Sequence, residues 1–246
     1  MKTLYYLFLS FRPYQWIKNG FVLLPLVFAQ KIFDHVSAME SIQAVAVFSM
    51  LSSALYMVND YLDREEDRNH PFKKNRPLAA GLIDPRLILT AAGIFFIISL
   101  FWSLLIKPVF FNTLLVYLGL QVLYNVKLRD VVILDLFCVA TGFFLRVVAG
   151  ATVIEVTMSR WLVVCTILIA LLLILSKRRH ELIMLGVAEP DKHRNVLSSY
   201  SALFLDQMIG VTAGAVILSY LLYCTSPETV QKYNTDKMIF TFPFVL

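Results

Sequence analysis

The segment NDYLDREED places three aspartates three and four positions apart, directly after a long apolar run. If the preceding helix continues at about 100° per residue, Asp60, Asp63 and Asp67 lie within about 60° of one another on one face, and Glu65 points away. Carboxylates this close repel one another unless a cation lies between them. Carboxylate oxygens are ligands that Mg²⁺ accepts together with water and phosphate oxygens, and Asn59 can add a carbonyl ligand or a hydrogen bond. The pattern indicates a Mg²⁺ site beside a phosphate-bearing substrate.

A solvated helix that simply pairs its charges, for example Asp60 with Arg64, is the open alternative. Such pairs stabilise a helix by only about 0.3–0.5 kcal/mol each, and spacing alone does not separate the two interpretations. The residues that follow favour the site. Basic side chains come within ten positions of the last carboxylate, at Arg68, Lys73, Lys74 and Arg76. They suit a ligand that is both metal-bound and strongly anionic, such as a diphosphate.

Two further charged segments are predicted to meet the first at the mouth of a helical bundle. YNVKLRDVVILD and SKRRHE together supply Lys127, Arg129, Asp130, Asp135, Lys177, Arg178, Arg179 and Glu181. Asp135 and Arg146 fall at the edge of or within apolar helices, where a charge is costly and faces a cavity or a partner. A functional role is favoured at Asp135. At Arg146 function and structural pairing stay equally open.

The elements that must position these residues are membrane helices. The chain has 246 residues, is 59% hydrophobic and has a mean hydropathy of +0.71. Apolar runs of about 17 to 25 residues recur along it, which is typical of an all-α polytopic membrane protein. We expect one membrane domain over 1–246, with seven spans plus the start of an eighth: 18–33, 38–58, 86–106, 108–124, 132–152, 160–176, 201–224 and the run from Met238.

Lys and Arg are distributed unevenly across this expected topology. If spans alternate in direction, the N-terminus and the loops 59–85, 125–131 and 177–200 share one side. That side carries sixteen of the 22 Lys and Arg residues and the other side five, which predicts that the charged loops and the N-terminus are cytoplasmic. The net charge of +5 then follows from topology and implies no nucleic-acid partner. Three cysteines and four histidines without ligand spacing make a disulfide framework or a transition-metal centre improbable.

The sequence resembles the UbiA-type superfamily of intramembrane prenyltransferases, whose first signature is N-D-x-x-D-x-x-x-D. NDYLDREED matches it at every fixed position. Within the superfamily the likeness is to decaprenyl-phosphate phosphoribosyltransferases, carried by RPYQWIKN, EEDRNHPFKKNRPLAAG, GFFLRVVAGA and KRRHEL. The branch pattern Y-x-x-x-L-K-x-x-x-x-x-D aligns with Tyr124, Arg129 and Asp135, and it leaves Asp130 without a place.

This resemblance implies Mg²⁺-dependent transfer of a 5-phosphoribosyl group from phosphoribosyl diphosphate to a polyprenyl phosphate at the cytoplasmic face of the inner membrane. The implied metal ligands are Asn59, Asp60, Asp63 and Asp67, and the catalytic set is these three aspartates with Asp135. The implied substrate-binding residues are Lys18, Asn59, Arg68, Lys73, Arg76, Tyr124, Arg129, Arg146, Lys177, Arg178 and Glu181. Membrane lipids are the further expected partners, and a homo-oligomer stays open. The resemblance implies nine helices, so we expect this chain to lack the last part of the bundle.

Two alternatives remain. An aromatic prenyltransferase that joins a polyprenyl diphosphate to a quinone or haem precursor explains the aspartates but not the basic density at Lys73–Arg76 and Lys177–Arg179. A membrane transporter is expected to carry ionisable groups at helix midpoints or broken half-helices, and Arg146 is the one candidate for that.

Overall fold

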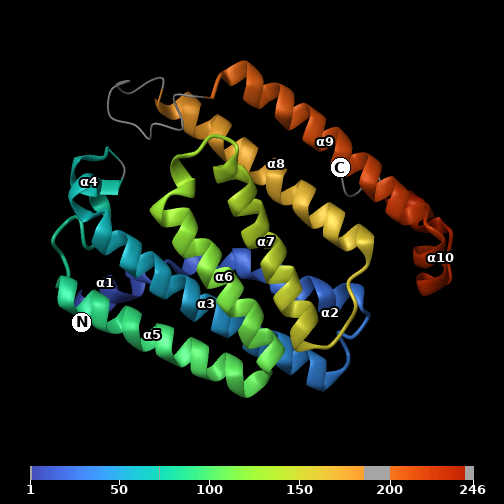
Figure 1. Ribbon diagram of the computed structural model, residues 1–246, viewed down its shortest axis with the longest axis horizontal. Helices are drawn as coiled ribbons and strands as arrows, with labels where there is room; N and C mark the ends of the chain where they lie inside the picture. The colour runs from blue at the N-terminus through green and yellow to red at the C-terminus, as the bar shows by residue number, and fades with distance from the viewer. Residues whose placement is uncertain (1, 72, 186–199, 242–246) are drawn as a thin grey trace. The chain divides into compact units, whose positions relative to one another are not determined.

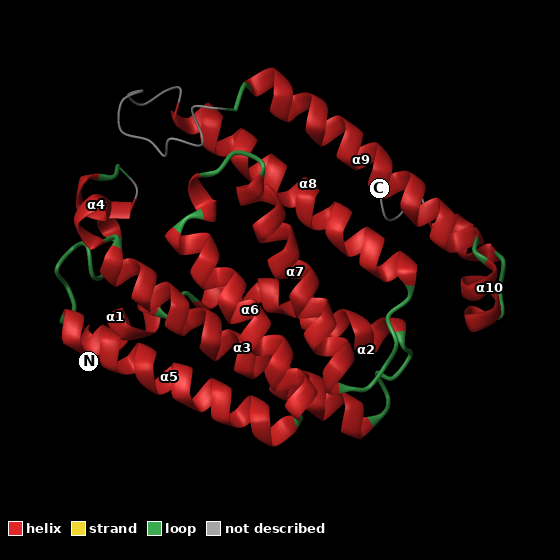
Figure 2. Ribbon diagram, viewed as in Figure 1, coloured by secondary structure: helices red, strands yellow, loops and turns green. Residues whose placement is uncertain are grey.

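The computed structural model describes residues 2–71, 73–185 and 200–241, and within these ranges all regular structure is helical (Figure 2). The predicted all-α fold class is confirmed. The chain divides into two compact units: unit 1 comprises Met1–Leu118 and Arg146–Val156, and unit 2 comprises Gly119–Leu145 and Thr157–Leu246. The expectation of one membrane domain stays a prediction.

The helices carry the labels of Figure 1. Unit 1 contains α1 (Lys2–Ser10), η1 (Pro13–Leu23), α2 (Leu24–Phe28), α3 (His35–Leu62), α4 (Arg64–Asn69), η2 (Lys73–Asn75) and α5 (Pro85–Ile106). Unit 2 contains η3 (Leu128–Asp130), α8 (Arg160–Leu185), α9 (Ala202–Thr225), α10 (Pro227–Tyr233) and η6 (Lys237–Thr241). Two helices have residues in both units, α6 (Pro108–Val126) and α7 (Leu134–Val153).

Six helices of the described chain are long and apolar enough to cross a membrane: α3, α5, α6, α7, α8 and α9. They match six of the expected spans, and the protein is an integral membrane protein. The expected span at 18–33 is not among them, and this prediction was wrong as to helix type. The segment is a 3₁₀ helix followed by a five-residue α-helix. Gly20 and Pro25 disfavour a continuous α-helix here. Of the expected eighth run, residues 238–241 belong to η6 and the rest lies outside the described residues.

η1 nevertheless runs along α3 in the opposite direction. Trp16 Nε1 donates to Ser53 Oγ over 2.9 Å, and Asn19 Nδ2 donates to Ser49 Oγ over 3.0 Å. Farther along, Gly150 of α7 packs directly on this segment, since a Cβ there would lie 1.9 Å from the carbonyl oxygen of Val22. The segment before α3 therefore packs antiparallel to α3, and it takes the place of the expected span at 18–33.

The core of unit 1 lies where α3, α5 and the loop between them meet. Its buried members include Met57 of α3, Leu78 and Ile83 of the loop, and Ile88 of α5. Both long helices have side-chain caps: Asp34 accepts from the first turn of α3, and Asp84 accepts from the Arg86 N–H of α5. The hydrogen bond from the Ser37 hydroxyl lowers the pKa of Asp34. The Asp84 cap fixes the start of α5, directly after the charged loop, and the Asp34 cap fixes the start of α3, away from that loop.

In unit 2, α8 and α9 lie side by side (Figure 1). Ion pairs join the two ends of this packed pair. Arg179 of α8 donates to Asp206 of α9 over 2.6 Å, and Arg160 donates to Glu228 of α10 over 2.7 Å at the opposite end. Buried Leu136, Ile174, Leu175, Tyr200 and Leu205 form the cluster beneath the loop-facing end.

Candidate active site

The acidic run occupies the junction of α3 and α4. The helical hydrogen-bond pattern continues through Asp63, because its N–H donates to the Asn59 carbonyl over 2.9 Å and its carbonyl accepts from the Asp67 N–H over 2.8 Å. The 3.6-residue period therefore persists across the junction. Asp60 and Asp67 are buried on the inner face at 5% and 1% exposure, and Glu65 is exposed. Asn59 and Asp63 are half-buried.

A guanidinium lies between the two buried carboxylates. Arg76 Nη1 donates to Asp60 Oδ1 over 3.0 Å and to Asp67 Oδ2 over 2.5 Å. Arg12, at the start of η1, donates a second hydrogen bond to Asp60 and lies over the ring of Tyr56 at 5.1 Å. A buried carboxylate that loses its cationic partner is strongly destabilising, so these contacts hold the acidic run in place.

Lys73 is the third cation of this cluster, with Nζ 3.8 Å from Asp67 Oδ1. Two buried carboxylates are thus surrounded by Arg12, Lys73 and Arg76. We call these five residues the aspartate–arginine cluster. The basic residues that follow the acidic run are therefore not only a solvated surface, since two of them contact the acids directly.

The donor chemistry of this cluster fits Mg²⁺, because Asp60 and Asp67 present carboxylate oxygens with Asn59 and Asp63 on the same helical segment. The assignment of Asp60, Asp63 and Asp67 as metal ligands stays a prediction. Among the described residues no group of three or more His, Cys, Asp or Glu side chains is placed to hold a metal ion. The physical reason is Arg76, which neutralises two of the carboxylates itself and holds them on its own nitrogen.

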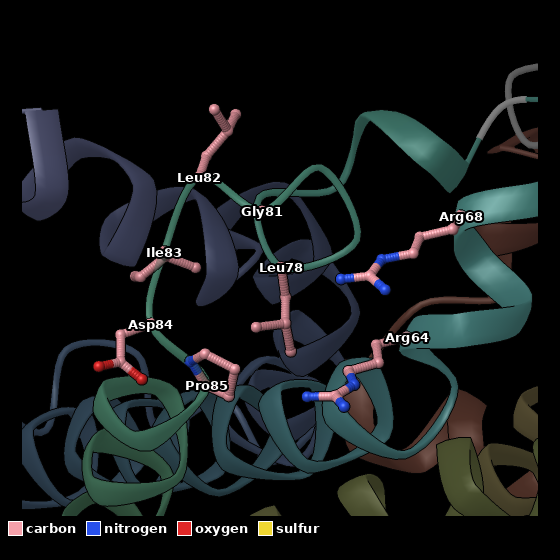
Figure 3. Close-up of a pocket in the computed structure, with 8 residues that line it drawn as sticks. All are labelled: Arg64, Arg68, Leu78, Gly81, Leu82, Ile83, Asp84 and Pro85. Atoms are coloured by element: carbon pink, nitrogen blue, oxygen red, sulfur yellow. The ribbon is translucent and has the colours of Figure 1, made fainter.

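Arg68 was expected to bind substrate beside these aspartates, and the structure places it on the other side of α4. Its guanidinium donates to both oxygens of Glu65, over 3.1 and 2.9 Å, and to the carbonyl of Ala79 over 3.3 Å. It also lines a separate cavity with Arg64 (Figure 3). The structure therefore does not bring Arg68 together with the buried aspartates, because position 68 follows Asp67 by one residue and turns outward by about 100°. Its substrate-binding role stays a prediction.

Arg146 is buried within unit 1 and contacts Asn19 of η1, Tyr117 of α6 and the Phe48 ring of α3. Its Nε donates to Asn19 Oδ1 over 2.9 Å and its Nη2 donates to the Tyr117 hydroxyl over 2.8 Å. The guanidinium carbon also lies 4.9 Å from the centre of the Tyr117 ring. Of the two interpretations left open by the sequence, these contacts favour structural pairing, because they anchor η1 through Asn19. Lys18, next to Asn19 in the sequence, is half-buried.

Unit 2 contains a second buried charged group, centred on Asp135. This carboxylate is fully buried and accepts from Arg178 Nε over 3.0 Å and from the Tyr200 hydroxyl over 2.6 Å. The Tyr200 oxygen in turn accepts from the N–H of Ile133 over 2.7 Å. Burial, with the hydrogen bond to Asp135, raises the pKa of Tyr200 to about 12. Asp135 is thus a fully partnered anion, and its guanidinium partner also donates to Glu181 over 2.7 Å.

The remaining predicted residues of unit 2 lie nearer its surface. Lys177 is exposed and lies 3.5 Å from Glu181. Arg129 is half-buried and pairs with Asp130 at 3.7 Å, and Tyr124 is half-buried at the end of α6. Their substrate-binding roles stay predictions.

Two residues with evident importance were not among the predicted site residues. Arg12 lies in RPYQWIKN, and its charge beside Pro13 at the start of an apolar segment is the signal that could have singled it out. Tyr200 precedes Ser201, the N-cap of α9. Nothing in its local sequence distinguishes it from other interfacial tyrosines.

Residues 21–225 of the chain match the UbiA prenyltransferase family. The chain belongs to this family. It is therefore an intramembrane transferase of the UbiA type.

UbiA-family relatives with assigned activities are similar over most of the chain. The decaprenyl-phosphate phosphoribosyltransferase of Mycobacterium tuberculosis is 31% identical over 218 residues, which cover 87% of this chain and 72% of that protein. The protein of the same name from Corynebacterium glutamicum is 33% identical over 87% of this chain and 65% of its own length. A UbiA homologue from Archaeoglobus fulgidus, solved bound to GPP and Mg²⁺, has a TM-score of 0.77 at 15% identity, covering 98% of this chain and 85% of that one. That structure supports the UbiA fold.

Proposed function

We propose that this UbiA-family transferase moves a 5-phosphoribosyl group from phosphoribosyl diphosphate to a polyprenyl phosphate in the cytoplasmic leaflet of the inner membrane. The observation that carries the proposal is the aspartate–arginine cluster, in which three cations surround two buried carboxylates. An allylic prenyl diphosphate presents one diphosphate group. Phosphoribosyl diphosphate presents a diphosphate and a separate 5-phosphate, so it can pair with more cationic side chains. The similarity to decaprenyl-phosphate phosphoribosyltransferases supports the same donor.

The proposed reaction requires little proton transfer. A phosphate oxygen of the lipid forms the new bond to C1 of the ribose while the bond from C1 to the diphosphate oxygen breaks, and the electron pair leaves with the diphosphate. The lipid phosphate is already an anion at neutral pH, so no general base is needed. This agrees with the scattered histidines of the sequence.

Asp60, Asp63 and Asp67, with Asn59, are the residues that would hold Mg²⁺. When bound, Mg²⁺ would neutralise charge that develops on the departing diphosphate. The chain's own cations have a complementary task. Arg76 and Lys73 lie at the carboxylates and can donate charged hydrogen bonds to diphosphate oxygens. Arg12 stays with Asp60 and keeps that carboxylate oriented.

Unit 2 enters the proposal through its own residues. We assign substrate-phosphate binding to Arg129 and Lys177, whose cationic ends are more accessible than that of Arg178. Arg178 and Tyr200 hold Asp135 instead, and Glu181 orients Arg178. The variants Arg129→Gln and Lys177→Gln test the assignment of these two residues. Each is expected to raise the KM for the substrate whose phosphate it binds, with a smaller change in kcat.

Isothermal calorimetry with purified protein, Mg²⁺ and phosphoribosyl diphosphate tests the proposed donor without the lipid. The proposal predicts saturable binding that inorganic diphosphate competes away. A preparation that is active as a prenyltransferase yet shows no heat with this donor would contradict the proposal. In that case the diphosphate arrives on the lipid, as in an aromatic prenyltransferase.

A further inference from the structure

A cavity of about 330 Å³ lies on the outer side of α4, away from Asp60 and Asp67. It is lined by Arg64, Arg68, Leu78, Gly81, Leu82, Ile83, Asp84 and Pro85. Both arginine side chains extend from α4 toward the turn that carries Leu78 and Gly81 (Figure 3). That turn has a positive φ of 71° at Gly81, which glycine adopts without strain. The cavity therefore has a cationic wall and a mainly apolar wall.

The two arginines of this cavity donate to an exposed carboxylate that another anion can replace, unlike the arginines of the aspartate–arginine cluster. Arg64 Nε and Arg68 Nη1 both donate to one carboxylate, Glu65, whose side chain is 64% exposed. Arg68 also donates to the Ala79 carbonyl. Exposed ion pairs of this kind contribute little to stability. Asp84 already accepts from the Arg86 N–H over 2.8 Å as the cap of α5. A phosphate can therefore replace Glu65 as the acceptor at little cost.

The position of the cavity indicates where that phosphate comes from. It lies between the end of span α3 at Leu62 and the start of span α5 at Pro85, and thus at a membrane surface. Leu82, which lines the cavity, is 48% exposed. The first turns of α5 add exposed Leu87 and Leu89. A soluble anion makes no use of such neighbours, whereas a lipid bound by its headgroup does.

We propose that Arg64 and Arg68 bind the phosphate of an anionic membrane phospholipid, whose acyl chains lie along the exposed apolar side chains at the start of α5. This site is separate from the proposed reaction and does not depend on its donor. A lipid bound there would contact α4, the helix that carries Asp67.

Native mass spectrometry of the protein in neutral detergent tests the proposal with phosphatidylglycerol and phosphatidylcholine as probes. The wild type is expected to retain phosphatidylglycerol in preference. Arg64→Gln/Arg68→Gln is expected to raise the apparent Kd for phosphatidylglycerol by about fivefold for each arginine removed. Glu65→Gln removes the competing carboxylate and is expected to lower that Kd.

Lys74→Gln/Arg86→Gln is the matched control, because it removes two exposed charges from the same loop and helix end without altering the cavity lining. It is expected to leave the Kd within about twofold. Thermal unfolding of each variant confirms that it is folded. Equal retention of phosphatidylglycerol and phosphatidylcholine by the wild type would overturn the proposal. So would an equal loss of phosphatidylglycerol affinity in the two double variants. If Arg64→Gln/Arg68→Gln lost affinity for added polyprenyl phosphate but kept phosphatidylglycerol, the cavity would bind the substrate lipid instead, and the proposal would fall. Full displacement of the lipid by inorganic phosphate would also overturn it, because it would indicate a free-anion site.

Discussion

Arg76 Nη1 lies 2.5 Å from Asp67 Oδ2, and the Asp67 side chain is 2% exposed. The same nitrogen contacts Asp60, so one guanidinium neutralises both buried carboxylates. Under the proposed function, Asp60 and Asp67 would hold Mg²⁺ in competition with Arg76. A guanidinium released from them could donate charged hydrogen bonds to the diphosphate of the proposed donor.

Arg76→Gln separates the two roles of this side chain, as cation for the aspartates and as ligand for the donor. With Mg²⁺ removed by a chelator, the free energy of unfolding of the variant is expected to fall. The loss is expected to be less than the about 3–5 kcal/mol lost when a buried charge has no partner, because Arg12 and Lys73 remain. Mg²⁺ is expected to stabilise the variant more than the wild type. Its Kd for phosphoribosyl diphosphate is expected to rise about tenfold or more. Thermal unfolding and calorimetry measure these effects.

Arg86→Gln is the control for Arg76→Gln, since it removes an exposed charge at the start of α5. If Mg²⁺ stabilises wild type, Arg76→Gln and the control equally, Arg76 does not compete with the metal.

Asp63→Asn tests whether the acidic run acts as a defined site. The change keeps size and hydrogen bonding but removes one carboxylate charge, so Mg²⁺-dependent turnover is expected to fall by a factor on the order of 10² or more. Glu66→Gln, on the exposed side of α4, is the control and is expected to retain turnover. Equal losses in both variants would mean that the net charge of the loop, and not a metal site, controls turnover.

Tyr200→Phe removes the hydroxyl that donates to fully buried Asp135 and accepts from Ile133. We expect the free energy of unfolding to fall by about 1–3 kcal/mol, because buried Asp135 and the Ile133 N–H each lose a hydrogen-bond partner. Tyr5→Phe, at an exposed tyrosine, is the control. Chemical unfolding in detergent measures the difference. A loss no larger than that of the control would show that the Asp135 network does not stabilise unit 2.

The same variant has a defined pH signature. The pKa of Tyr200 is raised to about 12 in the folded protein, above about 10 for an unfolded tyrosine. The folded state therefore holds this proton more tightly, and the associated stability is present below pH 10 and lost as the pH rises toward 12. Wild type is expected to lose more stability than Tyr200→Phe over that interval. Parallel losses would contradict the assignment.

The distribution of basic residues predicts which loops face the cytoplasm, and thiol labelling in a cysteine-free background tests that prediction. A cysteine at Asn75, in the charged loop after α3, is expected to react with an impermeant thiol reagent only from the cytoplasmic side. A cysteine at Phe33, before the opposite end of α3 and 93% exposed, is expected to react only from the other side. The reverse labelling pattern would invert the proposed topology.

Some of this architecture could be predicted because it follows from local periodicity. Helical spacing correctly places Asp60 and Asp67 inward and Glu65 outward, since the hydrogen-bond ladder continues across Asp63. The partners of these side chains could not be predicted in the same way. Arg12 is 48 residues from Asp60, and Tyr200 is 65 residues from Asp135. Such pairings depend on tertiary packing, to which no local pattern corresponds.

The broken helix before α3 shows a second limit of sequence patterns. Hydropathy detects an apolar run but not whether it is an α-helix or a 3₁₀ helix. The segment also has long-range contacts that no local pattern shows: the Asn19 side-chain amide donates to Ser49 and accepts from Arg146. Gly20 and Pro25 are the local signals that disfavour a regular span here.

A transfer assay with two labels tests the central claim most directly. Membranes containing the protein are given Mg²⁺, polyprenyl phosphate and phosphoribosyl diphosphate, labelled in one sample on the 5-phosphate and in another on the diphosphate. The account predicts that the 5-phosphate label enters the lipid fraction while the diphosphate label is released as inorganic diphosphate. Asp63→Asn membranes are expected to show neither. If wild-type membranes transfer no 5-phosphate label to lipid, yet join a polyprenyl diphosphate to an aromatic acceptor, the proposed phosphoribosyl transfer is contradicted.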